Sequence, residues 1–298
     1  MKSKRNLIQI CLLCAAMLPA VVQAQFIFTT NNDGSLNISQ YTGSVGAVAI
    51  PSMTNGLLIT SIGTNAFINT DLTSVTIPYS ITNIGNFAFV CELLTAITVD
   101  TNNPTYSSVD GILFNKSQTT LIQYPSSKAG NTYTIPSCVT SIGGDAFYFC
   151  LSLTNITIGN STTNIGDMAF YYCGNLTSII FGNSVICIGS DAFEECYSLT
   201  SITIPNSVIS IGDEAFYECN SLTNVTVGDG VTNIGNMVFV LNGLTAITVD
   251  TNNPTYSSVD GILFNKSQTT LIQYPRIKGG NTYTIPSSVT SIGSWAFS

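Results

Sequence analysis

Apolar and polar residues alternate in short blocks throughout this chain, and the blocks share one spacing. In one block Leu199, Ile202 and Ile204 follow the pattern L-x-x-L-x-L. Ile202 and Ile204 are two positions apart, so both side chains lie on one face of a strand and Thr203 lies on the other. Pro205 ends the strand because it has no N–H to donate. The pattern predicts a short strand with one buried face.

The residues after this strand predict a turn that leads back to the core. Ile211 is apolar, and Gly212 permits a backbone conformation that a side chain would crowd. Asp213 and Glu214 are acidic, which suits the free N–H groups at the start of a short helix. Phe216 then supplies a large apolar side chain. We therefore expect a short helical or 3₁₀ segment opposite each strand.

The block recurs along nearly the whole chain. Glycines from Gly143 to Gly235 are 23 residues apart, and residues 94–125 are identical to residues 244–275. One unit cannot cover its own apolar face, whereas stacked units share a continuous core. The sequence predicts an α/β repeat solenoid with short parallel strands on one face and short helical or 3₁₀ turns on the other. Ile-Gly-x-x-Ala-Phe, with one Val for Ala, begins at Ile62, Ile84, Ile142, Ile165, Ile188, Ile211, Ile234 and Ile292.

The consensus L-x-x-I-x-I-P-x-x-V-x-x-I-G-x-x-A-F-x-x-C resembles the BspA-like, or treponemal-type, leucine-rich repeat over nearly all of residues 44–298. Tyr-Ser-Ser-Val-Asp-Gly-Ile-Leu-Phe-Asn-Lys resembles the long variant repeat of that class, which places long repeats near 94–125 and 244–275. The resemblance implies N-terminal cap strands over 25–50 and a solenoid over 51–298. It also implies an adhesin that acts at cell surfaces.

The N-terminus predicts export. Lys2, Lys4 and Arg5 precede an apolar stretch, and a cleavage site follows at Ala24, so residues 1–24 are expected to be a signal peptide. A membrane anchor is the weaker alternative because the apolar stretch is too short. The chain also stops in the middle of a coil, so we expect that a longer parent protein carries any anchor.

The charge balance narrows the classes of partner. Only 8% of the residues are charged. Removal of residues 1–24 leaves five basic residues against 16 acidic ones, a net charge near −11. Binding to nucleic acid or to anionic membranes needs basic patches, which this composition disfavours. The mature chain also has no apolar run long enough to span a membrane.

Catalysis is not expected. The chain contains no histidine, which excludes Ser/His/Asp and Cys/His catalysis and histidine metal sites. The densest acids, at 194–195 and 213–214, occupy repeat positions where solvated capping explains them. The loops at Asp100 and Asp250 lack the Gly and distal Glu of an EF-hand, so a turn is favoured over a calcium site. We expect no enzyme activity, no metal and no cofactor.

The cysteines follow the repeat. Seven remain after cleavage, an odd number, and four of them are spaced 23 residues apart. Buried thiols are favoured over disulfides, because a cysteine behaves as a small apolar residue and in-register cysteines point in parallel. The four are Cys150, Cys173, Cys196 and Cys219.

Two columns that follow each phenylalanine are the candidate binding site. Tyrosine offers a large contact area at low entropic cost, and acids alternate with the rings. An equally weighted alternative is that the rings pack between coils as filler. The columns comprise Tyr148, Tyr171, Glu194 and Tyr217, followed by Phe149, Tyr172, Glu195 and Glu218. A weaker candidate is the outward column of Thr76, Thr98, Thr134, Thr157, Thr203 and Thr226, because threonine simply suits strands.

The sequence therefore predicts an exported cell-surface or secreted protein that binds other proteins, with adhesion to host or neighbouring-cell proteins as its role. An extracellular matrix or surface glycoprotein is the expected ligand. The alternative is a structural spacer or envelope repeat module without a specific ligand.

Overall fold

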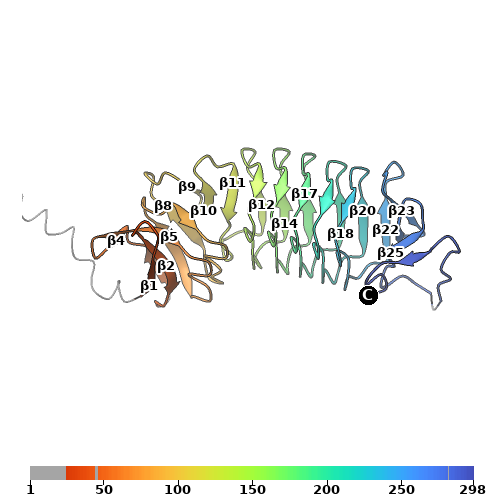
Figure 1. The fold of residues 1–298 in the computed structure, drawn as a ribbon, viewed down its shortest axis with the longest axis horizontal. Helices are drawn as coiled ribbons and strands as arrows, with labels where there is room; N and C mark the ends of the chain where they lie inside the picture. The colour runs from red at the N-terminus through yellow and green to blue at the C-terminus, as the bar shows by residue number, and fades with distance from the viewer. Residues whose placement is uncertain (1–24, 44–45, 281) are drawn as a thin grey trace, which may run out of the picture.

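The chain folds into a long β-solenoid of about 11 turns, shown in Figure 1. The computed structural model describes residues 25–43, 46–280 and 282–298. The predicted signal peptide, residues 1–24, lies outside the described residues. No helix within the described residues is long and apolar enough to cross a membrane.

A β-hairpin covers the N-terminal end of the solenoid. Strands β1 and β2 pair antiparallel, and β2 then pairs parallel with β5. Phe26, Ile38 and Tyr41 of the hairpin are buried in the same core as Phe67. The strands of this region are β1 (Phe26–Thr30), β2 (Leu36–Tyr41), β4 (Met53–Thr54), β5 (Leu57–Ile62) and β7 (Asn83–Ile84).

One face of the solenoid consists of the predicted parallel strands. They form three sheets, each with successive coils in register, so that Ile156 lies beside Ile179 and Ile202 beside Val225. The sheets are β3 (Gly46–Ala49), β6 (Leu72–Ile77) and β8 (Ala96–Val99); β12 (Thr132–Thr134), β14 (Asn155–Thr157) and β16 (Ser178–Ile180); and β18 (Ser201–Ile204), β20 (Asn224–Val227) and β22 (Ala246–Val249).

A second ladder is built from the short segments that end at the Ile of each Ile-Gly motif. Its first strands form an antiparallel hairpin in the long repeat, and the rest pair parallel. It contains β9 (Tyr106–Val109), β10 (Ile112–Asn115), β11 (Thr120–Gln123), β13 (Ser141–Ile142), β15 (Asn164–Ile165), β17 (Cys187–Ile188), β19 (Ser210–Ile211) and β21 (Asn233–Ile234). The second long repeat forms β23 (Tyr256–Val259), β24 (Ile262–Asn265), β25 (Thr270–Gln273) and β26 (Ser291–Ile292).

The predicted helical or 3₁₀ face is wrong: the third side consists of turns, with no helix among the described residues. The N–H groups of Met168, Phe170 and Tyr172 donate to carbonyls of the next coil at 2.8–2.9 Å. These groups cannot then bond within their own coil, as a helix requires. Met168 and Tyr172 also have φ of 56° and 58°, which interrupts any helical run.

The same geometry explains why the acids before Ala-Phe do not cap a helix. Glu214 has φ of 55°, and its N–H donates to Asn236 of the next coil at 2.8 Å. A non-glycine residue in this conformation costs about 1–2 kcal/mol. Each inter-coil hydrogen bond returns about 0.5–1.5 kcal/mol, so the stack of coils stabilises the turn.

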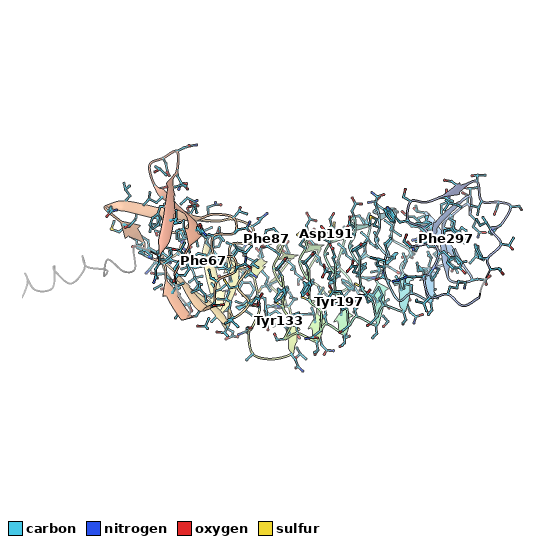
Figure 2. The ribbon with its side chains drawn as sticks, turned by 90° about the horizontal axis from the view of Figure 1, so that it is seen from below. Phe67, Phe87, Tyr133, Asp191, Tyr197 and Phe297 are labelled. Atoms are coloured by element: carbon cyan, nitrogen blue, oxygen red, sulfur yellow. The ribbon has the colours of Figure 1, made fainter. Side chains whose placement is uncertain are left out.

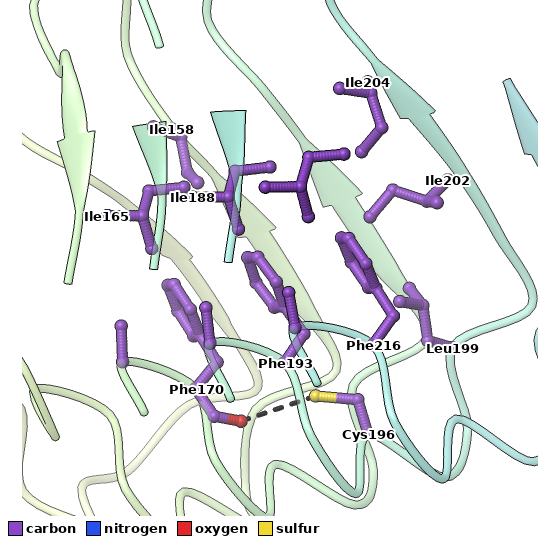
Figure 3. Packing of buried hydrophobic residues seen from close by; sticks show 14 of the residues in the cluster. Ile158, Ile165, Phe170, Ile188, Phe193, Cys196, Leu199, Ile202, Ile204 and Phe216 are labelled. Carbon is purple, nitrogen blue, oxygen red and sulfur yellow. Dashed lines mark hydrogen bonds between the residues drawn. The ribbon is translucent and has the colours of Figure 1, made fainter. Parts of the chain in front are cut away.

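Phenylalanine rings form the centre of the core. Figure 3 shows Phe170, Phe193 and Phe216 in a column, and Phe147 continues it. Their centroids are 4.6, 5.0 and 5.2 Å apart in chain order, with nearly parallel planes. Stacked aromatic pairs contribute about 0.5–1.5 kcal/mol beyond their buried area. Each coil is thus stabilised by the stacking of its phenylalanine ring on the rings of the two adjacent coils.

The cysteine column runs beside these rings. Cys196 is fully buried, and its thiol donates to the Phe170 carbonyl at 3.4 Å, as Figure 3 shows. Cys173 and Cys219 make the equivalent bond at 3.1 Å. All seven cysteines of the described residues are free thiols, which confirms the interpretation as buried thiols for the column.

The parallel strand face is interrupted between β16 and β18, which belong to different sheets. We call this interruption the seam. Here the inward residue is the bulky Phe181, packed edge-on against Phe193 at 5.9 Å, where the next coil has Ile204. Both strands line a cleft of about 780 Å³. The other sides of the two coils stay paired, through β17–β19 and through the Tyr172 N–H. The seam therefore opens one side of the solenoid only.

Candidate binding edge

The turns place the eight predicted site residues on one long side of the solenoid. We call them the aromatic–acidic edge. The second residue after each phenylalanine has positive φ, from 54° at Glu218 to 61° at Phe149. This conformation turns the side chains outward at the same point of each coil, and all eight are half-buried. Figure 2 labels Phe87 and Asp191 on one long side of the solenoid, and Tyr133 and Tyr197 toward the other.

The rings of the edge stack on one another along the solenoid axis. Tyr148 and Tyr171 lie 5.2 Å apart with an interplanar angle of 5°. Phe149 and Tyr172 lie 4.9 Å apart at 7°. Stacking explains part of their burial, as the filler interpretation predicts. Because each ring also remains partly exposed, the same rows leave aromatic surface accessible to solvent.

Two aromatic residues extend these rows beyond the predicted set. Phe87 packs edge-on against Tyr148 at 5.6 Å, although the chain between them includes a whole long repeat. Tyr197 packs edge-on against Tyr172, also at 5.6 Å. Gly174 leaves room for it, since a Cβ there would lie 3.3 Å from the Tyr197 ring. The sequence could have indicated Tyr197, because it is the one aromatic residue at its repeat position. The equivalent positions of the neighbouring coils hold Leu151, Gly174 and Asn220.

Glu195 joins the two rows. Its carboxylate accepts hydrogen bonds from the hydroxyls of Tyr171, at 3.2 Å, and of Tyr197. Burial, followed by the nearby Glu194 and Glu195 carboxylates, raises the pKa of Tyr171 above its usual value. Both phenols therefore remain protonated donors at neutral pH.

Three carboxylates gather beside the rings. The ligand-type oxygens of Asp191, Glu194 and Glu214 lie within 4.8 Å of one another. Burial, together with Asp191 and Glu214, raises the pKa of Glu194 to about 8. Glu194 is thus mostly protonated at neutral pH and shares a hydrogen bond with Asp191, which relieves the repulsion within the group.

The edge lies in a part of the chain without basic residues. Residues 129–265 contain eleven acids and no Lys, Arg or His. Within the described residues, Glu195, Glu214 and Glu218 therefore face no compensating cation on their own coils. This gives the edge a negative potential that attracts positively charged partners.

The other predicted features lie elsewhere. The threonine column lies on the outer surface of the strand face, where all of its members are exposed except the half-buried Thr157, and Ile180 interrupts it with 60% of its surface exposed. The Asp100 loop is a turn, in which the Asp100 carboxylate accepts the Asn102 N–H at 2.8 Å. Asn103 of this loop is fully buried and holds the coil through four hydrogen bonds, at 2.8–2.9 Å.

Comparison with known proteins identifies the family. A family model described as BspA type leucine rich repeat region matches residues 46–133 and 126–245, with six copies. This match covers well over half of the chain, and the chain belongs to the BspA-type leucine-rich repeat family. No curated protein matches the chain.

Solved structures share the fold at low sequence identity. A leucine-rich repeat protein from Eubacterium ventriosum is 20% identical with a TM-score of 0.58, and 93% of each chain is covered. The pneumococcal vaccine antigen PcpA is 19% identical with a TM-score of 0.56, covering 90% of this chain and 77% of that one. A leucine rich cell surface protein from Faecalibacterium prausnitzii is 20% identical with a TM-score of 0.54, covering 76% and 93% respectively.

Proposed function

We propose that this protein is exported to the cell surface, where it binds other proteins through the aromatic–acidic edge and acts as an adhesin rather than an enzyme. The observation that carries the proposal is the alignment of half-exposed rings and carboxylates over four successive coils. Tyrosine-rich surfaces of this kind suit protein recognition because large rigid rings lose little entropy on binding.

The family and the structural neighbours support the proposed location at the cell surface. One structural neighbour is described as a cell surface protein and another as a vaccine antigen. The positively charged start and apolar stretch of residues 1–24 agree with export. An extracellular matrix or surface glycoprotein is the ligand class that we propose to test.

The test is surface plasmon resonance of residues 25–298 over immobilised matrix glycoproteins at two salt concentrations. We expect saturable binding that weakens when Tyr148, Tyr171 and Tyr217 are all replaced by serine. Tyr79→Ser is the matched control, because Tyr79 is 47% exposed and lies outside the edge. Equal loss in the control variant would show that the edge is not the binding site.

The stacking of the rings favours a second candidate, a spacer without a specific ligand. In that case the tyrosines stabilise the stack and bind nothing. The triple variant would then lower the unfolding temperature, and neither it nor the unmodified protein would bind any matrix protein saturably.

A further inference from the structure

Each long repeat interrupts the parallel sheets of the strand face, so the strand next to it has an edge without a parallel neighbour. The chain itself caps the edge that comes before each long repeat. The forward edge of β8 faces the β9–β10 hairpin. There the Ile97 N–H donates to the Gly111 carbonyl at 2.8 Å, and the Val99 N–H donates to the Ser108 hydroxyl at 2.9 Å. The forward edge of β22 is capped in the same way by Gly261 and Ser258 of the second long repeat. Such capping prevents pairing with other chains.

The edge of β12, on the far side of the same hairpin, is not capped. β12 pairs only with β14, and the Ile135 N–H donates to the Thr157 carbonyl at 2.9 Å. Backbone groups alternate along a strand, so those of Thr132 and Thr134 point away from β14. Among the described residues, the N–H and C=O groups of these two threonines have no hydrogen-bond partner.

A cleft of about 660 Å³ lies beside this open edge. Buried apolar side chains, Ile112, Phe114 and Tyr124, form its floor. Asp110 and Lys128 stand at its rim, where the Lys128 ammonium donates to the Asp110 carbonyl. One acid and one base give the rim little net charge. The cleft therefore suits an uncharged segment with an aliphatic side chain directed at the floor.

We propose that β12 accepts an extended segment of a partner protein, which adds to the sheet as a further strand. Thr132 and Thr134 supply two donors and two acceptors, and the cleft takes one inward side chain. Strand addition of this type gains affinity from main-chain bonds and specificity from alternate side chains. The inference is independent of the aromatic–acidic edge, because none of the eight edge residues lines the cleft beside β12.

The repeat itself shows which sequence fits. Between ordinary coils, the place that is open beside β12 is occupied by the strand of the preceding coil. Residues 199–205, Leu-Thr-Ser-Ile-Thr-Ile-Pro, contain such a preceding strand, and their Ile202 and Ile204 point inward. β18 offers the backbone groups of Ile202 and Ile204 to the next coil, as the bond from Gly228 to the Ile204 carbonyl shows. The partner segment that we infer has this alternation of aliphatic and small polar residues.

The probe is the heptapeptide of residues 199–205, labelled with a fluorophore through a hydrophilic spacer, and the protein is residues 25–298. We expect saturable binding by fluorescence anisotropy and slowed hydrogen exchange at the Thr132 and Thr134 amides. Two further peptides carry N-methyl groups, one at the residues matching Ile202 and Ile204, the other at those matching Ser201 and Thr203. Because only one edge of an added strand faces β12, one of these peptides should bind at least tenfold more weakly and the other almost normally.

Variants of the protein test the open edge directly. Thr134→Pro removes the N–H that points into the cleft and leaves the bonds to β14 intact, so at least a tenfold loss of binding is expected. Thr134→Ala keeps that N–H and should bind the peptide normally. The tyrosine-to-serine variant of the aromatic–acidic edge should also bind it normally, which separates this test from that of the proposed function.

Several results would overturn the inference. Equal binding of both N-methylated peptides would show that the cleft holds side chains without adding a strand, and absence of binding would show that this strand class does not fit. Self-association of the free chain that Thr134→Pro abolishes, measured by sedimentation velocity, would assign the edge to a second copy instead of a partner. If Thr134→Pro unfolds by circular dichroism, the N-methylated pair still decides the outcome.

Discussion

Replacing Phe193 with alanine removes one ring from the middle of the core column. The ring is fully buried, stacks on Phe170 at 5.0 Å and on Phe216 at 5.2 Å, and meets Phe181 edge-on. Loss of a buried phenylalanine costs about 3–5 kcal/mol. Two parallel stacks at about 0.5–1.5 kcal/mol each place this site in the upper part of that range, near ~4 kcal/mol.

The assay is urea unfolding followed by circular dichroism. With a slope of about 3 kcal/mol per molar urea, a loss of this size lowers the midpoint by roughly 1–2 M. Hydrogen exchange should show the largest loss of protection in the coils of Phe170, Phe193 and Phe216, because each repeat contacts only its neighbours. Phe193→Leu keeps most of the volume, so its cost should be about 1–2 kcal/mol.

The matched control is Phe297→Ala, whose ring is 51% exposed and stacks on Tyr274 alone, at 5.2 Å. Its cost should be about 1 kcal/mol. If Phe193→Ala and Phe297→Ala cost the same, or if protection is lost evenly along the chain, the account of a column stabilised by neighbouring rings is refuted.

Three further predictions concern buried polar groups. Asn103→Ala should cost about 3 kcal/mol by urea unfolding, since it leaves the Ile81 carbonyl and two N–H groups without partners and takes one of two donors from the Pro78 carbonyl; a cost below 1 kcal/mol would contradict this role. Because its folded-state pKa is raised to about 8, Glu194 binds more protons in the folded state, so stability should fall between pH 4.5 and 8. Glu194→Gln should flatten that fall, measured as the free energy of unfolding against pH, by about 1 kcal/mol after allowance for solvent screening; an unchanged slope would argue against it. A thiol reagent at pH 8 should label the exposed Cys138 first, whereas burial, which raises the pKa of Cys173 to about 12, should protect the buried thiols until unfolding; equal labelling rates for Cys138 and Cys173 would contradict the burial.

The sequence could predict the features that follow directly from the period. The spacing of Ile202, Ile204 and Phe216 determines which side chains enter the core, and the 23-residue repeat brings equivalent residues into columns. The eight residues of the edge therefore do lie together. The turn geometry could not be predicted in the same way. Positive φ at Glu214 and Tyr172 has no glycine to signal it and exists only because the next coil accepts their N–H groups.

Contacts between coils on either side of a long repeat also could not be predicted from the sequence. Asp145 is buried, and its carboxylate accepts the Phe87 N–H although 58 residues separate the two. In an ordinary coil the equivalent N–H, that of Met168, donates to the Ser190 carbonyl of the next coil at 2.8 Å, and the Asp145 carboxylate takes that place for Phe87. Trp295 stands at the equivalent position 150 residues later and cannot accept such a bond. The surroundings of the two long repeats thus differ, although residues 94–125 and 244–275 are identical.

The seam gives the solenoid uneven mechanical strength along its axis. Where coils are joined on three sides, force applied at the two ends must break all three sets of contacts together. Between β16 and β18 one side is already parted, so only β17–β19 and the turn resist separation. Among the ordinary coils between the two long repeats, a stretched molecule should yield there first and release chain in steps of one coil, about 80 Å for 23 residues. A solenoid built this way can lengthen under load while its N-terminal and C-terminal coils remain folded.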